Sequence, residues 1–138
     1  MPITEAAAAA WPIELTLLLW SVALCVAQML LQAVGANLQA SLPVLAGNRE
    51  NMPTLTGWAG RAQRAHRNLL ENLPLFAILV LLAAITNGFT ATTALGAQLF
   101  FWARVAYAAV YLAGIPYLRT LIWLVSMVGL VLLFVELV

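Results

Sequence analysis

The chain has 138 residues, of which 64% are hydrophobic and 8% are charged, and its mean hydropathy is +0.99. It contains no Lys, no Asp, one His and one Cys, which excludes a Cys/His metal cluster, a Ser-His-Asp triad and a lysine-dependent phosphate loop. So much apolar surface indicates a membrane protein, and the net charge of +1 gives no reason to expect nucleic acid as a partner.

Four apolar stretches are each long enough for a helix that spans a bilayer, which takes about 20 residues. We expect helices at about residues 12–45, 60–86, 92–113 and 117–138. The expected fold is a single domain, residues 1–138, that forms an all-α membrane bundle of four transmembrane helices. The connecting loops are too short to hold a soluble module, and Asn87-Gly88 is a typical turn between helices.

The first helix carries polar and small residues on one face. At about 100° per residue they fall within about 60° of one another, and they are Ser21, Gln28, Gln32, Gly35 and Gln39. Such a stripe favours helix–helix packing, because a small residue allows close approach and amides bond across the contact. The preceding run Ala6–Ala10 is expected to begin this helix on the lumenal side of the membrane.

The second helix opens with the densest polar cluster of the chain. Five polar residues fall in an arc of roughly 120°, and they are Arg61, Arg64, Arg67, Asn68 and Glu71, with His66 pointing away. Charge is costly near hydrocarbon, so this arc should face a protein or water-filled interior. Its arginines suit an anionic ligand, because a guanidinium binds carboxylate or phosphate with two hydrogen bonds. The alternative is structural, with interfacial anchors and an Arg67–Glu71 pair one turn apart.

The third and fourth helices add aromatic and basic groups. Arg104, Tyr107 and Tyr111 share a face, and Arg104 lies well inside an apolar segment. Arg104 should therefore face inward and need a partner, for which Glu71 is the best candidate. The tyrosines suit either the membrane interface or a ligand. Arg119 opens the fourth helix, where it can contribute to a basic pocket or anchor the helix by snorkelling.

The arginines also predict the orientation. The loop that carries Arg49 leads into the second helix, and the turn before Arg119 lies on the same side of the bundle. The opposite side has Glu5 and Glu136 and no basic residue. By the positive-inside rule, the arginine-rich side is cytoplasmic and both termini lie outside.

The run from Arg61 to Pro74 resembles the second-helix signature of the MAPEG family, the membrane-associated proteins in eicosanoid and glutathione metabolism. A second similarity, to the tyrosine and arginine region of the same family, comprises Arg104-Val105-Ala106-Tyr107, Tyr111, Pro116 and Arg119-Thr120. Length, helix number and loop order agree as well, so the resemblance covers nearly the whole chain.

The resemblance implies a homotrimer with active sites between neighbouring subunits near the cytoplasmic face. It implies a glutathione-dependent transferase or peroxidase, without a metal, that acts on lipophilic electrophiles or lipid hydroperoxides. We expect it in a bacterial inner membrane, surrounded by lipids. The residues implied in glutathione binding are Arg61, Arg64, Arg67, Asn68, Glu71, Arg104, Tyr107 and Tyr111. Arg119 is implied as the thiol activator, with Thr120 beside it, because a guanidinium lowers the pKa of a thiol below its usual value of about 8.5.

The chain departs from the family at two positions. Eicosanoid-synthesising members carry a basic residue near the cytoplasmic end of the first helix, and residues 1–48 contain none. Trp123 also stands near a position where some members have tyrosine. One alternative is therefore a non-catalytic relative that binds a lipid or a partner protein in the same cleft. Another is a small multidrug exporter, a class that uses a single membrane carboxylate, for which Glu14 is the candidate.

Overall fold

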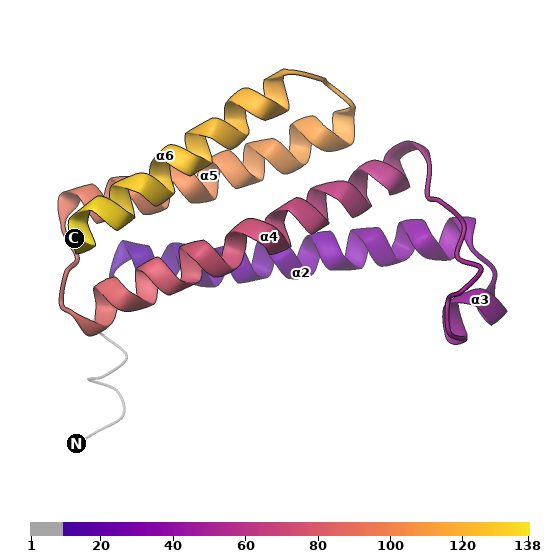
Figure 1. Ribbon diagram of the computed structural model, residues 1–138, viewed down its shortest axis with the longest axis horizontal. Coiled ribbons are helices and arrows are strands. Elements are labelled where there is room, and N and C mark those ends of the chain that lie inside the picture. The colour runs from indigo at the N-terminus through magenta and orange to yellow at the C-terminus, as the bar shows by residue number, and fades with distance from the viewer. Residues whose placement is uncertain (1–9) are drawn as a thin grey trace.

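The computed structural model describes residues 10–138, so the expectations about Glu5 and about Ala6–Ala9 fall outside the described residues. The described chain forms five helices: α2 (Ile13–Gln39), α3 (Leu42–Ala46), α4 (Gly57–Ile85), α5 (Ala91–Ala113) and α6 (Leu118–Leu137) (Figure 1). All except the short α3 are long and apolar enough to cross a membrane. The predicted all-α bundle with four membrane-spanning helices is confirmed.

The first helix is shorter than the sequence predicted. α2 ends at Gln39 rather than near residue 45, Ala40 and Ser41 are extended, and α3 then begins at Leu42. The physical reason is Pro43, which has no backbone N–H for a continuous helix but is well tolerated in the first turn of a new one. The loop after α3 is held to α2 by Gln39, whose side chain donates to the carbonyl of Thr56 and accepts from its N–H, both at 2.9 Å.

Close approach through glycine brings the helices together in two pairs. A Cβ on Gly35 of α2 would lie 2.7 Å from the Cβ of Ala59 in α4, so only glycine fits at this contact. A Cβ on Gly129 of α6 would lie 2.5 Å from the carbonyl oxygen of Gly96 in α5. These contacts pack α2 on α4 and α5 on α6, as the two pairs appear in Figure 1. The packing role predicted for the polar stripe of α2 is thereby confirmed at Gly35.

The four long helices share one apolar core. Each contributes a buried side chain, and these are Leu17, Phe76, Phe100 and Leu133. The rings of Phe76 and Phe100 stack with centroids 4.2 Å apart. The core fixes α4 against α5 and α6, which positions the polar residues about one to four turns away along the same helices.

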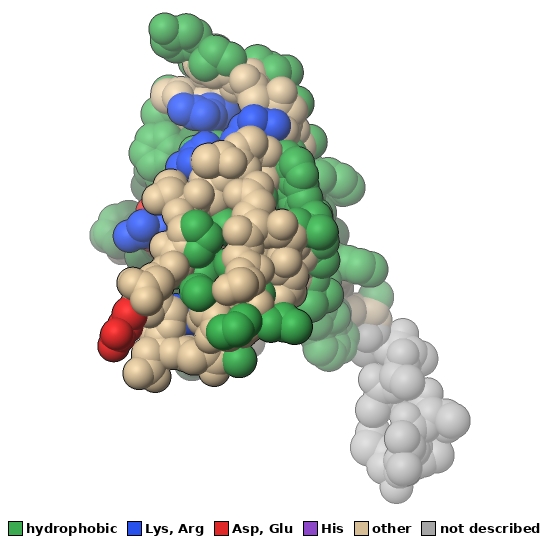
Figure 2. Space-filling model, turned by 90° about the vertical axis from the view of Figure 1, so that its right-hand side faces the viewer, with side chains coloured by type: hydrophobic (Ala, Val, Ile, Leu, Met, Phe, Trp, Pro, Cys, Tyr) green, Lys and Arg blue, Asp and Glu red, His purple; other side chains and the backbone are tan. Residues whose placement is uncertain are grey.

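The two ends of the bundle differ in polarity. α3 and the α5–α6 turn lie at one end, and the α4–α5 turn and the C-terminus lie at the other (Figure 1). Figure 2 looks onto the first end and shows arginine side chains gathered there; we call it the arginine end. At the opposite end the hydroxyl of Thr93 donates to the buried carboxylate of Glu14 at 2.6 Å, and that of Thr90 donates to Glu136 at 3.0 Å. The arginine-bearing connections do share one end, whereas their placement in the cytoplasm stays a prediction.

Candidate functional site

A cavity of about 160 Å³ opens at the arginine end among three helices. Its lining comes from α4, α5 and α6, and consists of Asn68, Tyr107, Arg119, Thr120 and Trp123. We call it the polar cavity. The residues from α6 lie in its first turns, directly after the tight turn at Gly114 to Tyr117, where both of these residues have positive φ. That turn brings Arg119 back beside the tyrosines of α5.

Arg104 lies behind the polar cavity and is buried to 1% exposure. Its Nη2 donates to Oδ1 of Asn68 at 2.7 Å, and its guanidinium lies 4.4 Å from the centre of the Tyr107 ring. Its Nε and Nη1 have no hydrogen-bond partner among the described residues. The inward orientation predicted from its depth is confirmed, and the guanidinium keeps two donors unused beside two residues of the cavity wall.

Glu71 is not the partner of Arg104, and that prediction was wrong. The Glu71 side chain is 64% exposed, and its carboxylate lies 3.8 Å from Nε of Arg67, which is 82% exposed. Residues three apart on a helix point roughly 60° away from each other, so Asn68 meets α5 while Glu71 does not. The predicted contact between Arg67 and Glu71 is present, but an exposed pair of this kind contributes only about 0.3–0.5 kcal/mol.

Tyr111 joins two arginines at the rim of the polar cavity. Nε of Arg64 donates to its hydroxyl at 3.1 Å, and the guanidinium of Arg119 lies 4.6 Å from its ring centre. The ring itself is buried and packs against Tyr107. A cation over an aromatic face is held without using its N–H groups. Arg119 is therefore fixed at the cavity wall with its donors available.

Arg61 has a different environment. Its Nε donates to the carbonyl of Leu112 at 3.0 Å, in the last turn of α5. A cation there satisfies a carbonyl that the helix leaves open and meets the negative end of the helix dipole. A Cβ on Gly114 would lie 3.5 Å from that Nε, so the glycine leaves room for the side chain. Arg61 supports the turn that carries α6 and does not line the polar cavity.

A model of the MAPEG family matches residues 17–138, nearly the whole chain. The chain belongs to the MAPEG family. It is an integral, multi-pass membrane protein, and its membership supports a function connected with glutathione or eicosanoid metabolism. No curated protein and no solved structure is significantly similar to it. The exporter alternative is set aside, because the family match covers nearly the whole chain.

The structure does not place all the residues that the MAPEG resemblance implied in one cavity. Asn68, Tyr107, Arg119 and Thr120 line the polar cavity, with Arg104 and Tyr111 directly behind them. A second cavity of about 310 Å³ lies toward α2 and is lined by Gln32, Gln63, Arg64, His66, Arg67 and Leu70. Arg67 belongs to that second cavity, and Arg64 reaches both it and Tyr111.

Two residues that were not among the implied binding and catalytic residues also line these cavities. Trp123, which the sequence placed near a family tyrosine position, lines the polar cavity one helical turn after Arg119. His66 is buried to 7% exposure, and its Nδ1 has no partner among the described residues. It lies beside Arg67 in the second cavity, on the face of α4 turned from Asn68.

Proposed function

We propose that this MAPEG protein is a glutathione-dependent transferase or peroxidase, and that the thiolate forms in the polar cavity beside Arg119. The observation that carries the proposal is the buried guanidinium of Arg104. The ion pair found in residues 10–138 joins Arg67 to Glu71, so the charge of Arg104 has no carboxylate partner there. An uncompensated buried charge is penalised by several kcal/mol. Two guanidinium nitrogens without partners favour a ligand that brings a carboxylate, and glutathione has two carboxylates.

The size of the polar cavity supports a site shared between subunits. Pockets for small ligands commonly enclose about 300–1,000 Å³, and this one encloses about 160 Å³. One subunit therefore holds part of a tripeptide and leaves the rest to be covered. A homotrimer of the kind expected for the MAPEG family would supply a neighbouring helix face as the missing wall.

Arg119 would act on the sulfur. Its guanidinium lies at the cavity wall, and a positive charge close to a thiol lowers the thiol pKa and raises the thiolate fraction at neutral pH. In conjugation, the sulfur bonds to an electrophilic carbon, and the leaving group departs with the bonding electrons. In peroxide reduction, the thiolate attacks the terminal oxygen and the O–O bond breaks. The alkoxide takes up a proton to give an alcohol, and a second glutathione converts the sulfenic acid to disulfide and water. The hydroxyl of Thr120 is a donor for the departing oxygen.

The predicted orientation supports the same proposal. Glutathione is a cytoplasmic solute, and the arginine end that carries the polar cavity is the end assigned to the cytoplasm by the positive-inside rule. A lipophilic second substrate would arrive from the surrounding lipid. We infer that the protein works in a bacterial inner membrane with its termini outside.

Calorimetric titration of glutathione into the detergent-purified protein tests the proposal. We expect binding at millimolar concentration or tighter, and a loss of at least about tenfold in affinity for Asn68→Ala, which removes the anchor of Arg104 and a residue of the cavity wall. Arg49→Ala is the matched control, because Arg49 is exposed in the loop and bonds only to the nearby Leu45 carbonyl. Absence of binding to a folded oligomer would refute the proposal and favour the lipid-binding relative.

A further inference from the structure

Helix α2 is longer than the apolar part of the bilayer. Its 27 residues span about 40 Å at 1.5 Å per residue, whereas the 20 residues of α6 span about 30 Å, which is the thickness of the hydrocarbon core. The two helices are level at the end away from the arginines, because the N-terminus of α5 bonds both to Glu14 near the start of α2 and to Glu136 near the end of α6. The extra length of α2, about 10 Å, therefore projects at the arginine end, where α3 follows it (Figure 1).

The exposed apolar surface of α2 continues past the end of that helix into α3. Along α2, exposed apolar side chains recur at every fourth residue, namely Val22, Val26, Leu30, Val34 and Leu38. Leu42, the first residue of α3, repeats this spacing and is 77% exposed. The headgroup layer adds about 5–8 Å to the hydrocarbon on each side. The projecting end of α2 and the helix α3 therefore lie at the depth of the lipid headgroups, where an exposed leucine can reach the acyl chains.

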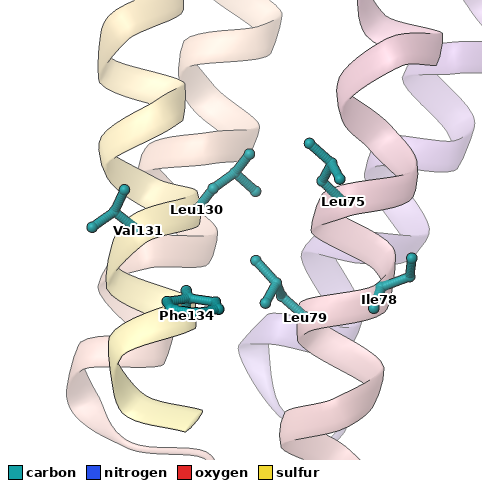
Figure 3. Close-up of a pocket in the computed structure, with 6 residues that line it drawn as sticks. All are labelled: Leu75, Ile78, Leu79, Leu130, Val131 and Phe134. Atoms are coloured by element: carbon teal, nitrogen blue, oxygen red, sulfur yellow. The ribbon is translucent and has the colours of Figure 1, made fainter. Parts of the chain in front are cut away.

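A cavity of about 320 Å³ lies beside α3, and we call it the α3 cavity. Its lining combines apolar, amide and charged side chains, and consists of Pro43, Val44, Asn48, Arg49, Glu50 and Asn51. It differs in kind from the apolar groove of about 310 Å³ between α4 and α6, where all six side chains labelled in Figure 3, among them Leu75 and Phe134, are aliphatic or aromatic. The α3 cavity can therefore select a ligand by its charges, which the apolar groove cannot do.

Arg49 and Glu50 bring opposite charges to the α3 cavity without pairing with each other. The ion pair found in residues 10–138 joins Arg67 to Glu71 instead. Nε of Arg49 donates to the carbonyl of Leu45 at 3.2 Å, which ties this side chain to the last turns of α3. A guanidinium binds a phosphate with two hydrogen bonds, and a carboxylate accepts hydrogen bonds from an ammonium group. One group of each kind in the same cavity fits a ligand that carries both a phosphate and a primary ammonium.

We propose that the α3 cavity binds the headgroup of phosphatidylethanolamine from the surrounding leaflet, with the phosphate at Arg49 and the ammonium at Glu50. The acyl chains of this lipid would lie along the exposed apolar surface that runs from Leu42 down α2. An anionic headgroup would match Arg49 alone and be repelled by Glu50, and a choline headgroup has no N–H to donate to that carboxylate. The volume is within the range of about 300–1,000 Å³ common for small ligands. The site is separate from the polar cavity and does not depend on glutathione.

Native mass spectrometry of the detergent-purified protein in glutathione-free buffer tests the headgroup assignment. Phosphatidylethanolamine and phosphatidylglycerol with identical acyl chains are offered together at equal concentration, and the bound fraction of each is measured. We expect phosphatidylethanolamine to be favoured by about threefold, a size that exposed charge pairs can supply. Arg49→Ala should lower the binding of both lipids, because both carry a phosphate. Glu50→Gln should remove or reverse the preference, because it removes the partner of the ammonium and the repulsion of the anionic lipid.

Matched control variants remove the same charges elsewhere at the arginine end. Arg67→Ala and Glu71→Gln alter an exposed pair on α4, so they change the net charge equally and leave the α3 cavity intact. Both should keep the preference of the unmodified protein. Equal or greater binding of phosphatidylglycerol to the unmodified protein would overturn the inference. So would the same change of preference in Glu50→Gln and Glu71→Gln, which would assign it to overall charge, or equal lipid binding by Arg49→Ala and Arg67→Ala.

The depth of α3 is measured in lipid nanodiscs with a nitroxide label. The label is attached at Leu42→Cys in a Cys25→Ala background and should collide more often with oxygen, which is enriched in the bilayer, than with a water-soluble nickel complex. The same label at Val34→Cys, which is 51% exposed on α2, gives the reference for contact with lipid. A label at residue 42 that meets the nickel complex more often than oxygen would place α3 in water and overturn the inference.

Discussion

Replacement of Arg104 by Met should leave the fold at least as stable as before while it weakens glutathione binding. The substitution removes the charge and keeps an unbranched side chain of similar length in the space between α4 and α5. The guanidinium makes one side-chain hydrogen bond, to Asn68, and one cation–π contact, with Tyr107. If Arg104 serves to bind a ligand, its replacement should lower the affinity for that ligand without lowering the stability of the fold.

The favourable and unfavourable contributions of Arg104 to the free energy of folding are of similar size. The hydrogen bond of a charged group contributes about 1.5–3 kcal/mol, and a desolvated cation–π contact about 2 kcal/mol. Two costs oppose these contributions. Desolvation of the charge costs several kcal/mol in proteins, and each of the two unpaired donor nitrogens costs about 1–3 kcal/mol. Replacement of buried charges by apolar side chains of similar volume is neutral or stabilises by about 1–4 kcal/mol. We therefore expect the apparent Tm of Arg104→Met to equal or exceed that of the unmodified protein.

Thermal unfolding in one detergent at one scan rate, with and without glutathione, measures both effects. Glutathione should raise the apparent Tm of the unmodified protein, since a ligand that binds only the folded state stabilises it, and should have little effect on Arg104→Met. Phe76→Ala is the control for sensitivity, because that buried ring stacks on Phe100 and its loss should cost about 3–5 kcal/mol. A fall in Tm for Arg104→Met as large as that of Phe76→Ala would refute the reasoning and make Arg104 a structural residue.

Three further predictions concern the arginine end and the helix packing. Arg119→Ala should lower kcat by about tenfold or more while glutathione affinity changes little. Its pH–rate profile should move to higher pH, because the thiol pKa returns toward about 8.5 without the cation; an unchanged profile in stopped-flow assays would contradict this. Arg64→Ala, which loses the bond to Tyr111, should weaken glutathione binding in calorimetry more than it slows turnover. Gly129→Val should lower the midpoint of the circular-dichroism melt by an amount equivalent to about 1–3 kcal/mol, because its side chain would meet the backbone of Gly96; a midpoint equal to that of the unmodified protein would contradict the close contact.

Much of this fold could be predicted from the sequence because the bilayer constrains it strongly. Apolar length sets the helices, and turn residues such as Asn87-Gly88 separate them. The inward orientation of Arg104 followed from its depth in an apolar segment. The early end of α2 at Gln39 was harder to predict, because Pro43 is compatible both with a kinked helix and with the first turn of a new one.

The sequence could not predict which neighbouring helix each residue of the polar arc on α4 would meet. Helical spacing gives the direction of each side chain about its own axis, but it does not say which neighbouring helix lies in that direction or at what height. Asn68 and Glu71 both fell in the arc, and only the packing of α5 against α4 decides that Asn68 meets Arg104. Arg67 likewise belongs to the α2 side because of where α2 lies. A pattern on one helix locates a polar region, whereas its pairing depends on the rest of the bundle.

The two polar ends of the bundle differ in how fully their buried groups are paired. At the end away from the arginines, Thr93 donates to the Glu14 carboxylate and Thr90 donates to Glu136, so the buried acid has a donor. At the arginine end, Arg104 is equally buried but keeps two donors without partners among the described residues. Buried polar groups that serve only folding are normally satisfied within the protein. Under the proposed function, an anionic ligand would complete the unpaired donors beside the polar cavity.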